Sequence, residues 1–277
     1  DQNPLSVYAA DFDGNKGLDI IPTAFYKNLD GGLDEYPVFG RLDLQKQIIK
    51  VKADFLKHAD FGRATIKDIL NPHQIDSALV YRANYMQSSY IENIGNNKFK
   101  INPLPIDCQV APVYGMLADD FNHDGNLDVL LIGNDFGTEL ITGRFDALNG
   151  IMLAGDGKGG FNIVKLLESG FYVPGDAKAL ASLINDSGEQ LIIGTQNRGH
   201  LKVYSFDRGE SDVIRLLADD FLVEFIFPDG SRRKEEVYYG DTFLSQSSRK
   251  VIVPKNVSSI EITNFKGEKR KLQVGLD

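Results

Sequence analysis

The sequence contains a single cysteine, Cys108, and no tryptophan. One thiol excludes a disulfide framework and a cysteine zinc site. No stretch approaches eighteen consecutive apolar residues, so a membrane-spanning helix is excluded as well. Basic residues are fewer than acidic ones, 30 against 39, and the formal net charge of −9 argues against a nucleic-acid backbone as the main partner. Hydrophobic residues at 42% and charged residues at 25% are typical of a globular protein.

Glycine and the aromatic residues are plentiful, which favours short strands joined by tight turns. Two nine-residue segments, 11–19 and 120–128, share the pattern D-F-[DN]-x-[DN]-x-x-L-D, and each lies between apolar runs of strand length. Weaker copies precede the apolar runs 78–81 and 191–194. The copies recur at roughly 50–60 residues, and a period of that length with several short strands per unit predicts propeller blades.

The two acidic segments carry the side chains of a calcium loop. Oxygen ligands at positions 1, 3 and 5 of a tight turn can converge, and a carbonyl at position 7 and a carboxylate at position 9 can complete the shell of six to eight oxygens that Ca²⁺ requires. The first loop supplies Asp11, Asp13, Asn15, the carbonyl of Gly17, and Asp19. The second loop supplies Asp120, Asn122, Asp124, the carbonyl of Asn126, and Asp128.

An EF-hand is the obvious alternative for these loops, but it requires a bidentate glutamate at position 12 and flanking helices. Position 12 is Pro22 in one segment and Leu131 in the other, and strands are expected on both sides, so the EF-hand is excluded. A turn in which Asp and Asn side chains bond only the backbone remains an alternative.

Residues 40–72 are expected to form a helical insertion into the blades. A first helix is predicted over 44–56, and a second is predicted from Asp60, as its N-cap, to a stop at Asn71-Pro72. The first helix is indicated by apolar residues at steps of three or four, namely Leu44, Ile48, Val51 and Phe55.

The sequence changes character after Phe206. A polar linker over 207–212 leads into alternating strands with turns at 228–230 and 265–268. We therefore expect one domain at 1–206 and a small β domain at 211–277. A domain of about 60 residues is marginal alone, so we expect it to dock onto the blades through Phe221 or Phe243 and to cover an exposed strand edge.

A possible ligand surface combines aromatic, acidic and guanidinium groups. Asp135, Arg144 and Asp146 lie in one blade loop, and Tyr85 belongs to a group of tyrosines before it. Such groups suit a sugar-binding face, although tyrosines packed between blades are the alternative. A Ser-His-Asp triad, a zinc motif and a phosphate loop are all absent as patterns, so no catalytic residue is predicted.

The acidic loops, together with the Gly-Asp-Gly-x-Gly-x-Phe turn at 155–161, resemble FG-GAP/VCBS repeats, the calcium-carrying blades of integrin-α-like propellers. Residues 240–248 resemble the G-x-x-[FY]-L-S-Q-S signature of the ASPIC/UnbV domain, which follows such repeats in cartilage acidic protein and in bacterial secreted proteins. The resemblance implies a protein that is extracellular, periplasmic or associated with the outer membrane.

The sequence therefore predicts an all-β protein: a partial or truncated propeller with a helical insertion, followed by a small β domain, with further blades expected N-terminal to it. We expect a calcium-binding module that acts as a binding protein rather than as an enzyme, and whose partner is a protein or a glycan at the cell surface. A carbohydrate lyase or hydrolase on a propeller scaffold and a structural spacer are the alternatives.

Overall fold

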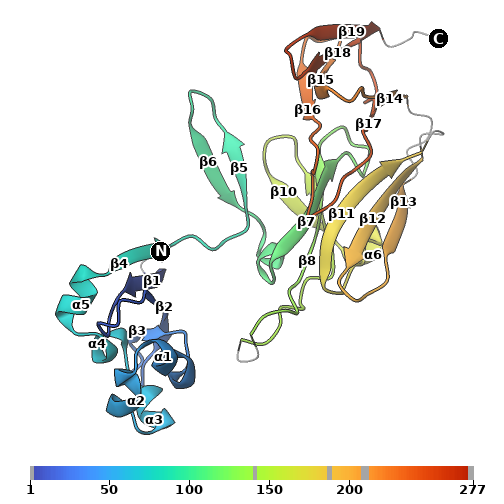
Figure 1. The fold of residues 1–277 in the computed structure, drawn as a ribbon. Helices are drawn as coiled ribbons and strands as arrows, with labels where there is room; N and C mark the ends of the chain where they lie inside the picture. The colour runs from blue at the N-terminus through green and yellow to red at the C-terminus, as the bar shows by residue number, and fades with distance from the viewer. Residues whose placement is uncertain (1–2, 140–141, 186–188, 207–211, 274–277) are drawn as a thin grey trace. The chain divides into compact units, whose positions relative to one another are not determined.

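The computed structural model describes residues 3–139, 142–185, 189–206 and 212–273 (Figure 1). The described residues form six antiparallel sheets of two to four strands, which confirms the predicted all-β class. The chain divides into two compact units, Asp1–Met86 and Gln87–Asp277. This division differs from the one expected from the sequence, which placed the boundary in the polar linker. Residues 207–211 of that linker lie outside the described residues.

The first unit is a four-stranded sheet with helices inserted between its last two strands in sequence. The strands are β1 (Leu5–Ala10), β2 (Asp19–Lys27), β3 (Leu33–Pro37) and β4 (Leu79–Ala83), in the order β3-β2-β1-β4. The 11–19 loop connects β1 to β2. The strand predicted after the weak repeat near residue 76 is β4, and it returns to pair with β1.

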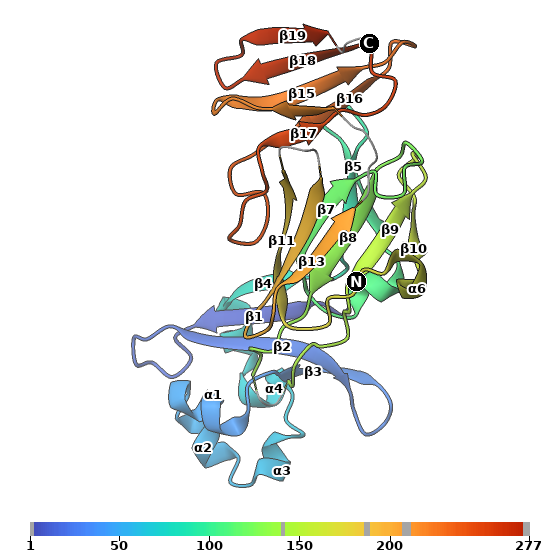
Figure 2. The same ribbon diagram turned by 90° about the vertical axis from the view of Figure 1, so that its right-hand side faces the viewer.

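The predicted helical insertion consists of short helices: α1 (Arg41–Gln47), α2 (Lys50–Asp54), α3 (His58–Phe61), α4 (Ile66–Ile69) and α5 (Pro72–Ser77). Figures 1 and 2 show them grouped beside the sheet of this unit. Their apolar side chains form one core with Tyr8, Phe12 and Ile21 of the strands and the acidic loop. As predicted, Leu44, Ile48 and Val51 are buried in that core.

The helices differ from those expected from the sequence in three places. The helix over 44–56 is broken at Ile48-Ile49, because two consecutive β-branched residues favour helix less than the residues around them. Asp60 lies inside α3, and the cap of the next helix is Thr65, in a capping box with Asp68. The helix α4 ends before Asn71-Pro72 as expected, but these residues also start a further helix, α5, which was not predicted. Asn71 accepts a hydrogen bond from the Gln74 amide, and proline suits the first helical position.

The second unit begins with the hairpin β5 (Ser89–Asn93) and β6 (Phe99–Pro103) and continues with two meander sheets. The first meander contains β7 (Val113–Asp119), β8 (Asp128–Gly133), β9 (Ile151–Gly155) and β10 (Phe161–Val164), followed by the short helix α6 (Leu166–Ser169). The second contains β11 (Ala177–Ile184), β12 (Gln190–Gln196) and β13 (Lys202–Phe206). The first has the four antiparallel strands of a propeller blade, and the second has three.

One apolar core joins the two meanders. It contains Leu130 and Ile132 of β8, Leu180 of β11 and Ile192 of β12, all fully buried. Phe121, from the second acidic loop, packs into the same core with a ring centroid 5.0 Å from that of Phe206. The acidic loop at 120–128 is therefore anchored where the two sheets meet.

The C-terminal part of the second unit is a separate sheet with its own core. Its strands β15 (Asp220–Ile226), β16 (Arg232–Glu236), β18 (Ser259–Asn264) and β19 (Lys269–Gln273) run in the order β16-β15-β18-β19. A two-stranded ribbon joins β14 (Val213–Arg215) to β17 (Lys250–Ile252). Asp220 is fully buried and pairs with Arg270, and hydrogen bonds from this guanidinium hold the pKa of the Asp220 carboxyl below its usual value.

The segment 242–248 covers the free edge of β11. Ser248 donates its amide to the Ser182 carbonyl at 2.8 Å, and the hydroxyls of Ser247 and Ser248 accept the amides of Ser182 and Ile184 at 3.1 and 3.0 Å. The Phe243 ring lies edge-on to Tyr114 at 5.5 Å, which confirms the expected contact through this residue. Phe221 instead stacks on Phe265 within the C-terminal sheet.

Candidate calcium-binding loops

The acidic residue at position 1 closes each loop on itself. In the first loop the Asp11 carboxylate accepts the amides of Gly14, Asn15 and Lys16 at 2.8, 3.0 and 2.9 Å. In the second, the Asp120 carboxylate accepts the amides of Asp124 and Gly125 at 3.1 and 3.0 Å. In both loops, therefore, the carboxylate at position 1 accepts the backbone amides of positions 5 and 6.

Backbone dihedral angles confirm that the two loops share one conformation. Positions 4 and 6 lie in the left-handed region in both: Gly14 and Lys16 have φ values of 79° and 72°, and His123 and Gly125 have values of 63° and 91°. Each loop therefore has one glycine and one non-glycine residue at these positions, in opposite order. Left-handed φ is unfavourable for residues with a Cβ, so Lys16 and His123 hold strained positions.

The acidic residue at position 9 is buried and ties the loop to the following strand. Asp19 is 4% exposed and accepts the Phe12 amide at 2.9 Å. Asp128 is fully buried and accepts three amides, those of Phe121 and Asn122 at 3.0 Å and that of Gly155 at 3.1 Å. Burial raises the pKa of both carboxyl groups above the usual value, because it disfavours the charged form.

Different parts of the chain brace the two loops. The helical insertion braces the first: Gln74 of α5 donates to the Phe12 carbonyl at 2.7 Å, and Gln47 of α1 accepts the Ile20 amide at 2.9 Å. A glycine turn braces the second, since Gly155 lies so close to the Leu127 carbonyl that a Cβ would approach its oxygen to 2.1 Å. The helical insertion therefore supports the first loop, which the sequence did not predict.

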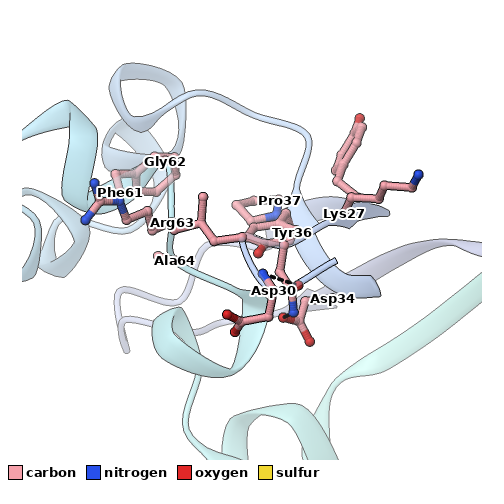
Figure 3. Close-up of a pocket in the computed structure, with 12 residues that line it drawn as sticks. Lys27, Asp30, Asp34, Tyr36, Pro37, Phe61, Gly62, Arg63 and Ala64 are labelled. Carbon is pink, nitrogen blue, oxygen red and sulfur yellow. Dashed lines mark hydrogen bonds between the residues drawn. The ribbon is translucent and has the colours of Figure 1, made fainter. Parts of the chain in front are cut away.

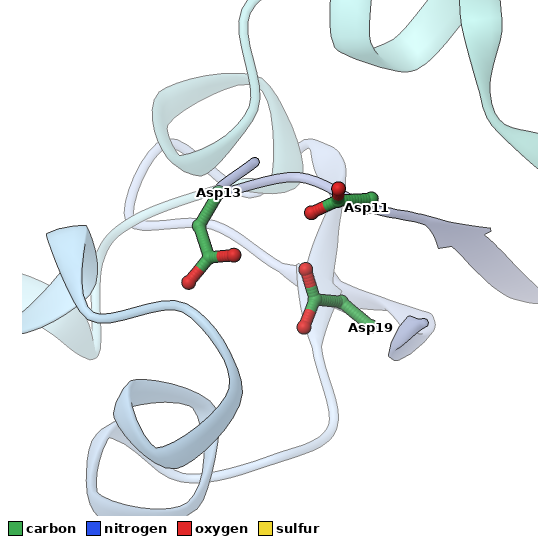
Figure 4. Close-up of side chains that lie close together, drawn as sticks. All are labelled: Asp11, Asp13 and Asp19. Carbon is green, nitrogen blue, oxygen red and sulfur yellow. The ribbon is translucent and has the colours of Figure 1, made fainter. Parts of the chain in front are cut away.

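The loops differ in how their carboxylates converge. Asp11, Asp13 and Asp19 each offer a carboxylate oxygen within 4.8 Å of the others, and Figure 4 shows the three groups turned toward one another. Among the described residues this is the only such group of three acidic, histidine or cysteine side chains. In the second loop position 3 is an amide, and Asn122 Nδ2 donates to Asp124 Oδ2 at 3.0 Å.

The donor set of the first loop fits a calcium ion. Three carboxylates, with the Asn15 side-chain oxygen and the Gly17 carbonyl beside them in the loop, are hard oxygen ligands of the kind Ca²⁺ takes. Each carboxylate has about four lone-pair sites, so accepting backbone amides leaves capacity for a cation. The second loop offers the oxygens of Asp120, Asn122, Asp124, Asn126 and Asp128, which include three carboxylates as in the first loop. Within the described part of the chain, only the three carboxylates of the first loop converge within 4.8 Å.

The residues predicted for a ligand surface lie in two places. Asp135 and Phe145 form a β-bridge, and Arg144 donates to Asp146 at 3.0 Å and lies 4.8 Å from the ring centroid of Phe136. Asp135, Arg144 and Asp146 thus share one loop of the second unit. Tyr85 lies in the first unit, after β4.

A polar cluster beside Asp135 was missed from the sequence. Tyr114 donates to Asp135 Oδ2 at 2.9 Å, and this bond raises the pKa of the tyrosine. Lys178 lies 3.8 Å from the Tyr114 ring centroid and pairs with Asp176 at 2.8 Å, with both side chains largely buried. Little in the sequence indicated this cluster, because Tyr114 lies near the start of β7 whereas Asp176 and Lys178 lie near the start of β11, far along the chain.

Neither the cysteine nor the helices suggest another function. Burial raises the pKa of the Cys108 thiol to about 11, so this side chain stays protonated at neutral pH and is a poor nucleophile. None of the helices in the described part of the chain has the length and hydropathy that crossing a bilayer would require.

Comparison with known proteins gives little beyond these observations. No family model and no curated protein matches the chain. Among solved structures, it is similar to virginiamycin B lyase from Staphylococcus aureus at 13% identity and a TM-score of 0.18, covering 62% of this chain and 59% of that one. A catalytically inactive variant of that lyase with quinupristin gives 13% identity and a TM-score of 0.16, covering 68% and 60%. The chain thus spans about three-fifths of these proteins, and similarities of this size identify neither a family nor an activity.

Proposed function

We propose that this protein is an extracellular calcium-binding β module in which the loops 11–19 and 120–128 each take one ion. The observation that carries the proposal is the convergence of Asp11, Asp13 and Asp19 in a loop whose backbone conformation recurs at 120–128. Carboxylates this close repel one another without a cation, so calcium should stabilise the folded state.

Thermal unfolding in calcium, in magnesium and in chelator tests this proposal. Extracellular calcium modules bind at ~10⁻⁴–10⁻³ M, and a ligand at a hundredfold excess over Kd stabilises the native state by about 2.7 kcal/mol. We expect a clear rise in melting temperature in millimolar calcium and a smaller one in magnesium, which prefers a compact octahedral shell. An unchanged melting temperature between calcium and chelator would contradict the proposal.

A control variant separates the loops from the general acidity of the chain. Asp76 is exposed and lies outside both loops. Asp76→Ala should keep the full calcium response, whereas Asp13→Ala should lose most of it. A similar loss in both variants would show that calcium acts through diffuse charge screening.

We further infer that the module binds a protein or glycan partner at the cell surface. Phe136 and Phe145 are 39% and 42% exposed beside the Arg144–Asp146 pair, and exposed aromatic and guanidinium groups are typical of binding surfaces. Arg144→Ala should reduce partner capture on a glycan array or from surface extracts without changing the melting temperature. Undiminished capture by the variant would exclude this loop.

A further inference from the structure

The first unit contains a pocket that no part of the calcium proposal uses. It has a volume of about 470 Å³ and lies between the β2–β3 hairpin and the segment 61–64 that joins α3 to α4 (Figure 3). None of the residues that line it belongs to either acidic loop. Its size falls within the range of pockets that hold small molecules.

Strand alternation directs two tyrosines and one carboxylate to this pocket. Tyr26 lies opposite Asp34 in the β2–β3 register, and Tyr36 lies two residues further along the same face. The Glu35 side chain lies on the opposite face of the strand, where its carboxylate accepts hydrogen bonds from Tyr8 and Thr23. The Tyr26 side chain is 53% exposed, and its ring centroid is 6.4 Å from that of Tyr36.

The charged groups at the pocket balance and are available for hydrogen bonding. Asn28 fixes Asp34 through a hydrogen bond of 2.8 Å, and Asp30 also lines the pocket (Figure 3). Arg63 comes from the helical side and Lys27 from the hairpin. Within the described part of the chain no carboxylate lies within 4.0 Å of the Arg63 or Lys27 cation. The four formal charges cancel, so the pocket gives no electrostatic preference to an ion of either sign.

We propose that this pocket binds a neutral saccharide of one or two sugar units. A tyrosine ring offers an apolar face to the C–H groups of a sugar, and a fixed carboxylate with a guanidinium offers strong charge-assisted hydrogen bonds to hydroxyls. A ligand without hydroxyls would leave these polar groups unpaired. An anion would be repelled by Asp30 and Asp34, and a cation would be repelled by Lys27 and Arg63. The inference rests on the proposed extracellular binding role but is independent of calcium binding.

Saturation-transfer NMR with the 1–277 chain tests the pocket. The probes are cellobiose, maltose, lactose and N,N′-diacetylchitobiose, with glucuronate as the anionic and glycine as the zwitterionic comparison. At the efficiency typical of small ligands, we expect at least one neutral disaccharide to bind with Kd on the order of 1 mM or tighter. No neutral probe binding at tens of millimolar, or tighter binding of glucuronate or glycine, would overturn the proposal.

Variants of exposed side chains localise the binding. Arg63→Gln removes a charged hydrogen-bond donor, so affinity should fall about tenfold or more. Lys67→Gln makes the same charge change on an exposed residue outside the pocket and should alter affinity by less than about twofold. Equal losses in the two variants would refute the site. Both variants should retain the calcium response, so failure of the saccharide site and failure of the calcium proposal are distinguishable.

Discussion

The loops 11–19 and 120–128 have the same hydrogen-bonded backbone but different side chains at position 3. Asp13 leaves three carboxylates facing one another in the first loop, whereas Asn122 donates to Asp124 and relieves part of that repulsion in the second. The second loop is also bonded to a neighbouring strand, since Asp128 accepts the Gly155 amide of β9 in addition to amides of its own loop, whereas Asp19 accepts the Phe12 amide of its own loop. One sequence pattern thus gives two loops, of which the first brings three carboxylates together and the second bonds to a neighbouring strand.

The largest expected effect is a loss of folding stability when the aspartate at position 9 of either loop is replaced. Asp128→Ala leaves two buried amides and one half-buried amide without their acceptor, which should cost roughly 3–5 kcal/mol. Asp19→Ala should cost roughly 1–3 kcal/mol. Urea unfolding in chelator, with hydrogen exchange to follow each unit, measures both. Equal costs would show that the extra amides of the second loop contribute nothing.

The next effect is on calcium-dependent stability. Asp13→Ala should remove the calcium stabilisation of the first unit, about 2.7 kcal/mol at a hundredfold excess over Kd. Asp124→Ala should remove less in the second unit, because among the described residues only the three carboxylates of the first loop converge within 4.8 Å. The difference in melting temperature between calcium and chelator gives both values. A larger loss in Asp124→Ala would reverse the ranking of the loops.

Asn122→Asp converts the second loop toward the first. The substitution replaces an amide donor with a carboxylate, and calcium affinity rises with the number of charged ligands, so Kd for this loop should fall about tenfold. Asn126→Asp is the matched control, because it adds the same charge at a position that contributes its carbonyl. If both variants tighten binding equally, net charge rather than position 3 sets the affinity.

The pH dependence should differ between calcium and chelator. Burial raises the folded-state pKa of Asp19 and Asp128, so without calcium their contribution favours folding at low pH and is lost as pH rises through that pKa. Calcium requires the deprotonated groups, so the calcium stabilisation should shrink as pH falls through the same range. Melting curves from about pH 4 to 7 test this. A calcium shift that is constant over that range would remove these carboxylates from the ion site.

The smallest expected effect is a gain in folding stability when glycine replaces the residues with left-handed φ, Lys16 and His123. Lys16→Gly and His123→Gly should each stabilise the protein by about 0.5–1 kcal/mol, because glycine accepts left-handed φ freely. Only Lys16→Gly should also tighten calcium binding, since it removes a positive charge from the first loop. Equal changes in calcium affinity would argue against an ion in that loop.

The sequence predicted the parts of this structure that depend on local pattern. The nine-residue repeats, the apolar face with Leu44, and the turn near 157 follow from spacing and glycine content. The break at Ile48-Ile49 interrupts a continuous apolar spacing, and the start of α5 depends on the cap at Asn71, so the spacing alone predicted neither boundary. The pocket at Tyr36 and Arg63 and the cluster at Tyr114 and Lys178 depend on tertiary contacts between distant segments, which a single sequence does not encode locally.

Isothermal titration of the calcium-free 1–277 chain with calcium tests the central claim most directly. We predict two binding events, of which the tighter disappears in Asp13→Asn while the weaker remains. Asp13→Asn preserves the size of the side chain and removes only its charge, so loss of the tighter event assigns it to the 11–19 loop. Absence of saturable heat up to about 10 mM calcium, or an unchanged titration in Asp13→Asn, would contradict the account.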